Sequence, residues 1–125
     1  MLREGDTVAR VGGDEFVIVV EPWNRRHADD LSGPDADQRR RVGVQVADRL
    51  VRAIREPFTV NGMEHAITMS IGIAYSSPVA LSGHAAMSAS DVLEEADAAM
   101  YLAKRQGKNR VEVSAVGRDG NARRR

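Results

Sequence analysis

The strongest constraint on the fold is a pair of adjacent glycines between two β-branched runs near the N-terminus. Residues 7–11 read TVARV, residues 16–20 read FVIVV, and residues 12–15, Gly-Gly-Asp-Glu, join them. β-Branched runs favour strands, and glycine readily adopts the positive φ angles that a tight hairpin turn needs. We therefore expect a β-hairpin with an acidic tip. Because its second strand is apolar at nearly every position, we expect that strand to be covered on both faces.

An amphipathic helix and a second hairpin are expected next. Residues 42–54 carry apolar side chains at three- and four-residue spacings, and the pattern stops before Pro57, which predicts a helix. Asn61-Gly62 lies between apolar stretches and is the most typical short hairpin turn. In residues 67–74 aliphatic side chains alternate with small ones. This alternation predicts one strand with an aliphatic face and a small face.

The C-terminal third is expected to form a capped helix and a last strand. Ser90 precedes an apolar stripe between residues 93 and 103, so it is the expected N-cap, and Gly107 is expected to end the helix. Residues 110–113 are expected to form a short strand, and residues 115–125 a flexible basic tail. The expected element order is ββαββαβ, which indicates a mixed α/β (α+β) domain.

Composition excludes several classes of protein. With 18 basic and 18 acidic residues the net charge is zero, so no overall field draws the chain to nucleic acid, and we expect no nucleic-acid partner. The absence of cysteine excludes disulfides and thiolate metal sites and fits a cytoplasmic protein. The sequence has no apolar run of the ~20 residues that a membrane-spanning helix needs, so we expect no membrane segment in it.

The acidic hairpin tip is the main candidate for chemistry. Gly12 and Gly13 would let the backbone approach a phosphate closely, and the carboxylates of Asp14 and Glu15 offer the hard oxygen ligands that Mg²⁺ prefers. A metal-bound nucleoside triphosphate is the ligand that such a tip suits. The alternative is a simple turn whose two acids are solvated, which is the more common case for an isolated turn.

Four stretches of the chain together resemble the GGDEF family of diguanylate cyclases. They are Gly-Gly-Asp-Glu-Phe at residues 12–16, Arg-Glu-Gly-Asp at residues 3–6, ITMSIGIA at residues 67–74, and EADAAMYLAK followed by GKNR within residues 95–110. The resemblance implies a nucleotidyl cyclase-like palm, which is a mainly antiparallel sheet with helices packed on it. It also implies a partial GGDEF domain over residues 1–114.

The resemblance also implies roles for the residues of the tip. Gly12 and Gly13 correspond to the residues whose backbone approaches GTP. Asp14 corresponds to the carboxylate that binds Mg²⁺ near the 3′-hydroxyl, and Glu15 to the second essential acid, so both are expected to be catalytic and metal-binding. Members of the family join two GTP molecules into cyclic di-GMP and release two pyrophosphates, and a complete domain acts as a homodimer.

Four charged residues outside the tip are further candidates. Lys104 and Lys108 match basic residues that the family directs at the triphosphate, and they would share one helix face if the helix continued that far; alternatively, they only complement the negative end of a helix. Arg3 and Asp6 match the Arg-x-x-Asp pattern of the family's inhibitory product site. Taken alone, such a pair is more commonly a surface ion pair.

The sequence departs from the family pattern at its N-terminal side. Domains of this family begin with a strand that carries another Mg²⁺-binding aspartate, followed by helices that recognise guanine, and no counterpart precedes the matching residues here. We therefore expect the 125-residue chain to be inactive on its own. Two alternatives stay open: a degenerate module that binds cyclic di-GMP through Arg3 and Asp6, and a gene fragment without function.

Overall fold

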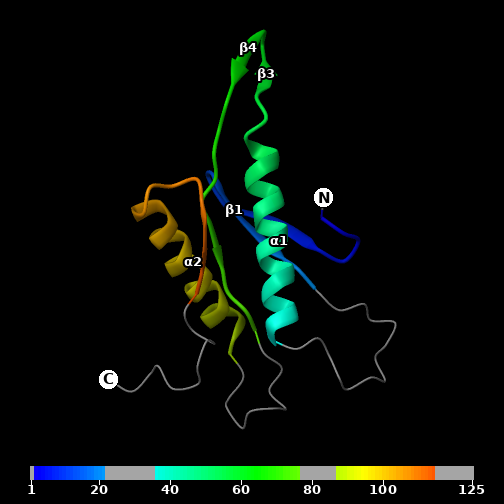
Figure 1. Ribbon diagram of the computed structural model, residues 1–125, viewed down its shortest axis with the longest axis vertical. Helices are drawn as coiled ribbons and strands as arrows, with labels where there is room; N and C mark the ends of the chain where they lie inside the picture. The colour runs from blue at the N-terminus through cyan, green and yellow to red at the C-terminus, as the bar shows by residue number, and fades with distance from the viewer. Residues whose placement is uncertain (1, 22–35, 77–86, 115–125) are drawn as a thin grey trace. The chain divides into compact units, whose positions relative to one another are not determined.

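The computed structural model describes residues 2–21, 36–76 and 87–114 (Figure 1). It is a mixed α/β structure with the element order ββαβββαβ, which confirms the expected fold class and contains one strand more than expected. The strands form three two-stranded sheets, two of them antiparallel and one parallel. The expected tail, residues 115–125, lies outside the described residues.

The first of two compact units, residues 1–46, contains the N-terminal hairpin. Strand β1 (Thr7–Gly12) pairs with β2 (Glu15–Val19) in antiparallel register, as expected. The expectation that β2 is covered on both faces is wrong, because the Phe16 side chain is 60% exposed. Among the described elements only β1 pairs with β2, so neither face of the hairpin is covered by another described strand or helix.

Helix α1 (Ala36–Ile54) runs from the first unit into the second, residues 47–125. Its buried side chains are Val46, Ala47 and Val51, at the one-, four- and five-residue offsets that place them on one side of a helix. The helix ends before Pro57, as expected, because the residue that precedes a proline disfavours helical backbone angles.

In the second unit, α1 is followed along the chain by a short hairpin (Figure 1). Strands β3 (Phe58–Val60) and β4 (Met63–His65) pair antiparallel across a two-residue turn. The turn residues Asn61 and Gly62 have φ angles of 51° and 79°. Positive φ at both positions is what this hairpin turn requires, so the expectation from the Asn-Gly pair is confirmed.

A parallel strand–helix–strand arrangement forms the rest of the second unit. Strand β5 (Ile71–Ile73) pairs in parallel with β6 (Val111–Val113), and helix α2 (Ala89–Arg105) connects them and packs on both. The fully covered side chains of α2 are Ala99 and Ala103. Small residues on this side of the helix allow it to approach the strands closely.

Two details of this region differ from the sequence expectation. The strand expected over residues 67–74 is shorter, because only Ile71–Ile73 have a partner strand in the described chain. The N-cap of α2 is Ser88 and not Ser90. The Asp91 N–H donates to Ser88 Oγ at 3.1 Å, and the Ser88 N–H donates to Asp91 Oδ2 at 3.0 Å. This reciprocal pair requires an acid three residues after the cap, which Ser88 has in Asp91.

The small face of β5 is the one that receives α2. A Cβ atom on Gly72 would overlap the Ala96 carbonyl oxygen and the Met100 backbone nitrogen, so only glycine fits at this contact. The stripe expected on α2 is partly wrong, because Leu93 is 48% exposed. The helix therefore turns Ala99 and Ala103, rather than Leu93, toward the strands.

Ser114 links the end of β6 to both neighbouring elements. Its side chain is buried, its N–H donates to the Ile73 carbonyl at 2.7 Å, and its hydroxyl donates to Glu95 Oε2 at 2.8 Å. Glu95, part of the family-like stretch on α2, thus has a structural role. Neither α1 nor α2, the helices that the structure describes, is long and apolar enough to cross a membrane.

Candidate functional site

The acidic tip is a two-residue turn with one glycine in the turn and one beside it. Gly12 lies opposite Glu15 in the strand register, which leaves Gly13 and Asp14 as the turn residues. Only Gly13 has a positive φ, of 25°, so the turn itself does not require glycine at position 12. A Cβ on Gly12 would lie 3.8 Å from Glu15 Oε2. The missing side chain at this position therefore leaves open space beside the Glu15 carboxylate.

Both carboxylates of the tip are exposed to solvent. No cationic side chain of the described chain pairs with Asp14 or Glu15. Proteins commonly bind Mg²⁺ through one or two carboxylates while water and phosphate oxygens complete its shell. The two acids fit this mode. The described residues contain no cluster of three or more potential metal ligands.

Arg10 belongs to the tip, although the sequence analysis did not single it out. Its Nε–H donates to the Gly13 carbonyl oxygen at 2.9 Å. The strand register shifts between Arg10 and Gly12, which is a β-bulge next to the turn. The sequence feature that could have indicated this role is a single arginine, three residues before the turn glycine, in a strand of otherwise small and β-branched residues.

Arg3 and Asp6 form a closed turn that leads into β1. The Arg3 N–H donates to Asp6 Oδ2 at 2.7 Å, the Asp6 N–H donates to the Arg3 carbonyl at 3.0 Å, and Gly5 allows the turn with a φ of 110°. The guanidinium of Arg3 is exposed and pairs with no carboxylate in the described chain. The surface ion pair that the sequence left open is therefore not formed; the backbone N–H of Arg3, and not its side chain, holds Asp6.

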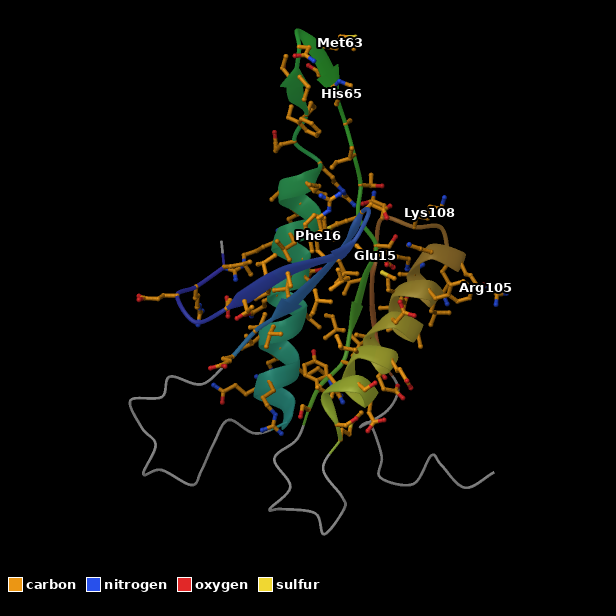
Figure 2. The ribbon with its side chains drawn as sticks, turned by 180° about the vertical axis from the view of Figure 1, so that it is seen from behind. Glu15, Phe16, Met63, His65, Arg105 and Lys108 are labelled. Atoms are coloured by element: carbon orange, nitrogen blue, oxygen red, sulfur yellow. The ribbon has the colours of Figure 1, made fainter. Side chains whose placement is uncertain are left out.

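Lys104 and Lys108 lie in the second unit, at the C-terminal end of α2. The helix ends at Arg105, and Lys108, with a φ of 62°, lies in the loop beyond it (Figure 2). The sequence had suggested that the two lysines would share one helix face if the helix continued that far, and it does not. Gly107, with a φ of 114°, ends the helix as expected, and the Lys108 N–H donates back to the Ala103 carbonyl at 3.0 Å. Both lysine side chains are exposed.

The loop after α2 is held in place by its own side chains. Arg110 donates from one terminal nitrogen to the Gln106 carbonyl at 3.1 Å and pairs through the other with Glu112 at 2.7 Å. Asn109 has a φ of 48°, and its buried Oδ1 has no hydrogen-bond partner. Lys108 is therefore presented by a fixed loop whose backbone is left-handed at three successive residues.

The candidate residues fall into two groups. Residues 12–15 and Arg10 form one tip, and Arg3 with Asp6 precede it in the same unit. Lys104 and Lys108 belong to the other unit. The structure thus brings the acidic and backbone parts of the candidate site together on one hairpin and the two cations together at one helix end.

Comparison with known proteins identifies the family. The family model described as "Diguanylate cyclase, GGDEF domain" matches residues 1–110. The chain is 38% identical over 114 residues to the diguanylate cyclase DgcP of Pseudomonas aeruginosa, which is 90% of this chain and 14% of DgcP. It is 36% identical over 108 residues to the bifunctional diguanylate cyclase/cyclic di-GMP phosphodiesterase MucR of the same species, covering 86% of the chain and 13% of MucR.

A relative from a second species gives the same result. The chain is 31% identical over 112 residues to the diguanylate cyclase DosC of Escherichia coli, which is 90% of the chain and 20% of DosC. The chain thus spans a fifth or less of the length of these relatives. Because the family match runs through the acidic tip, the turn before it and the lysine-bearing end of α2, we conclude that the chain belongs to the GGDEF family of diguanylate cyclase domains.

Proposed function

We propose that the chain acts as part of a diguanylate cyclase domain, which condenses two GTP molecules into cyclic di-GMP and releases two pyrophosphates. The observation that supports this most directly is the exposed tip, where Asp14 and Glu15 make no ion pair with another described residue and Gly12 leaves space beside the Glu15 carboxylate. The named activities of the relatives support the same reaction.

The reaction explains why the tip carries acids rather than a nucleophilic side chain. Each 3′-oxygen attacks the α-phosphorus of the other GTP; a new oxygen–phosphorus bond forms, the bond to pyrophosphate breaks, and the hydroxyl proton leaves to a base or water. Asp14 and Glu15 would hold Mg²⁺, which neutralises phosphate charge when bound. Asp14 would also lie near the 3′-hydroxyl, and Gly12 and Gly13 would let the backbone approach the phosphates.

Lys104 and Lys108 would bind the triphosphate of GTP. Both are exposed cations without a described carboxylate partner, so neither charge is neutralised by a neighbour. The proposal requires a homodimer, because each reacting GTP is presented by one protomer.

We further propose that residues 1–114 form a partial GGDEF domain that does not make cyclic di-GMP alone. The β1–β2 and β5–β6 pairs are separate sheets in the described chain, so each keeps an edge without a described partner. In the family, a first strand carries the other metal-binding aspartate, and residues 1–114 contain no match to it. Purified chain incubated with GTP and Mg²⁺ is therefore expected to yield no cyclic di-GMP; its formation would refute this point.

The turn formed by Arg3 and Asp6 favours a second, regulatory function. The exposed Arg3 guanidinium has a planar fork of donors that can bind a phosphate or a guanine edge, and the Asp6 carboxylate is held in position by the Arg3 backbone N–H. We propose that this turn binds cyclic di-GMP as an inhibitory product site. If the chain were only a binding module, this site alone would account for its function.

Two substitutions separate catalysis from product binding. They are made in a fusion protein. In it, the part of the DgcP cyclase domain that precedes the matching region is joined to the N-terminus of this chain and supplies the family's first strand and the guanine pocket. Asp14→Asn should abolish synthesis and leave cyclic di-GMP binding unchanged, whereas Arg3→Ala should weaken product binding and leave initial synthesis unchanged. The matched control is Arg49→Ala, at an exposed arginine of α1. Full synthesis by the Asp14→Asn protein would overturn the catalytic assignment.

A further inference from the structure

The strand register shows on which face of the hairpin Arg10 lies. Arg10 lies opposite Phe16 in the register, whereas Gly12 lies opposite Glu15. Successive side chains of a strand point to opposite faces, so Glu15 and Phe16 are on opposite faces of the hairpin. Directly paired residues share a face, which puts Arg10 on the Phe16 face, away from the Glu15 carboxylate.

The hydrogen bond from Arg10 fixes the peptide unit in the middle of the turn. Arg10 Nε–H donates to the Gly13 carbonyl at 2.9 Å, so this carbonyl points toward the Arg10 side. The peptide bond is planar and no cis peptide occurs in the described chain, so the N–H of Asp14 points the opposite way from the Gly13 carbonyl. The Asp14 N–H therefore faces the side of the hairpin that carries the Glu15 carboxylate.

The tip needs such a restraint because its backbone is otherwise permissive. Gly13 is in the left-handed region, where glycine is free to adopt other angles, and a β-bulge precedes the turn. The only described hydrogen bond made by the Arg10 guanidinium is the one to Gly13, and it forms no ion pair with Asp14 or Glu15. The arginine thus restrains the turn without neutralising the acids.

We propose that Arg10 is a positioning residue, which orients the Asp14 N–H toward a phosphate on the same face on which Glu15 holds the metal. This rests on the proposed function, since it deepens the role of the same tip. A phosphate bound there would accept from the Asp14 N–H while its Mg²⁺ binds the carboxylates. Arg10 acts through Gly13 and does not itself touch the ligand.

Three substitutions of Arg10 separate its donor from its charge. In glutamine the side-chain nitrogen is attached to Cδ, as Nε is in arginine, so Arg10→Gln keeps a donor at the same position and removes the charge. Arg10→Lys keeps the charge but places a methylene at that position. Arg10→Met removes both. The control is Arg49→Met, at an exposed arginine whose side chain makes no described contact.

The test uses the full 125-residue chain labelled with ¹⁵N and nuclear magnetic resonance. In the free chain, the Gly13 and Asp14 amide shifts of Arg10→Gln should match the wild type, while those of Arg10→Lys and Arg10→Met should differ from it. On titration with Mg²⁺ and inorganic triphosphate, wild type and Arg10→Gln should shift the Asp14 amide with similar affinity. Arg10→Lys and Arg10→Met should bind about tenfold more weakly. This is the size expected for the loss of one hydrogen bond from the Asp14 N–H to a charged phosphate oxygen.

Other outcomes overturn the proposal in distinguishable ways. Identical free-chain amide shifts in all four proteins would show that Arg10 does not hold the turn. Full binding by Arg10→Lys together with weak binding by Arg10→Gln would show that its charge, and not its donor, matters. The expected free-chain pattern with no response to Mg²⁺ and triphosphate in any protein would overturn the ligand role and, with it, the proposed function of the tip, while the Arg10–Gly13 bond itself would stand.

Discussion

Replacing Gly72 by alanine tests the close approach of β5 and α2. The added Cβ would lie 2.9 Å from Met100 Cα and still closer to the Ala96 carbonyl oxygen and the Met100 nitrogen. All three atoms are backbone, so no side-chain rotation relieves the overlap. Carbon atoms pack at about 3.5–4.0 Å, so the strand and helix must separate by roughly 1 Å, which loses a quarter to a half of each contact's dispersion energy. We expect a loss of about 3 kcal/mol, the upper end for overpacking.

The assay is urea unfolding followed by circular dichroism. Gly62→Ala is the matched control, because that position has open space around it and its φ of 79° costs only backbone strain, about 1–2 kcal/mol. Adding Met100→Ala to the Gly72→Ala protein should not restore stability, since the obstructing atoms of Met100 are backbone. A loss below about 1 kcal/mol for Gly72→Ala, or rescue by Met100→Ala, would refute the reasoning.

Three further predictions concern the helix cap, the tip glycine and the end of β6. Ser88→Ala should lower the free energy of unfolding by about 1 kcal/mol in the same urea assay, because it removes the helix cap. Ser90→Ala, inside the helix, should leave that free energy unchanged or raise it slightly. A larger loss for Ser90→Ala than for Ser88→Ala would restore Ser90 as the cap. Gly12→Ala should change the free energy of unfolding by less than about 0.5 kcal/mol, because the added Cβ lies at an ordinary contact distance from its nearest neighbour. The same change should weaken the binding of Mg²⁺ and triphosphate measured by calorimetry, and equal binding would contradict a close backbone approach at this position. Ser114→Ala should cost about 1–2 kcal/mol in thermal unfolding, because it removes the buried donor to Glu95, and an unchanged melting temperature would show that this bond contributes nothing net.

Features that depend on neighbouring residues in the sequence could be predicted. The two hairpin turns, the course of α1 to just before Pro57 and the end of α2 at Gly107 all follow from local backbone preferences. The chemistry of the acidic tip stays a prediction from residue types, since adjacent carboxylates beside glycines suit a metal-bound phosphate whatever the surrounding fold. Family membership followed from the same residues, and the family match over residues 1–110 confirmed it.

Features that depend on distant partners could not be predicted. Whether Phe16 is buried depends on what covers β2, and the described chain covers neither face. The alternation in residues 67–74 defined two faces, but only the packing of α2 determined that the Gly72 face receives the helix.

Sequence alone therefore determined the local turns, the helices and the chemical character of the tip, because each arises from residues within one or two turns of the chain. Tertiary structure decided what meets each element: Phe16 stays exposed on β2, the Gly72 face of β5 receives α2, and Ser114 reaches Glu95 on α2. The physical reason is that backbone preferences act between neighbouring residues, whereas the direction of a side chain and its hydrogen-bond partner depend on the register and packing of the folded elements.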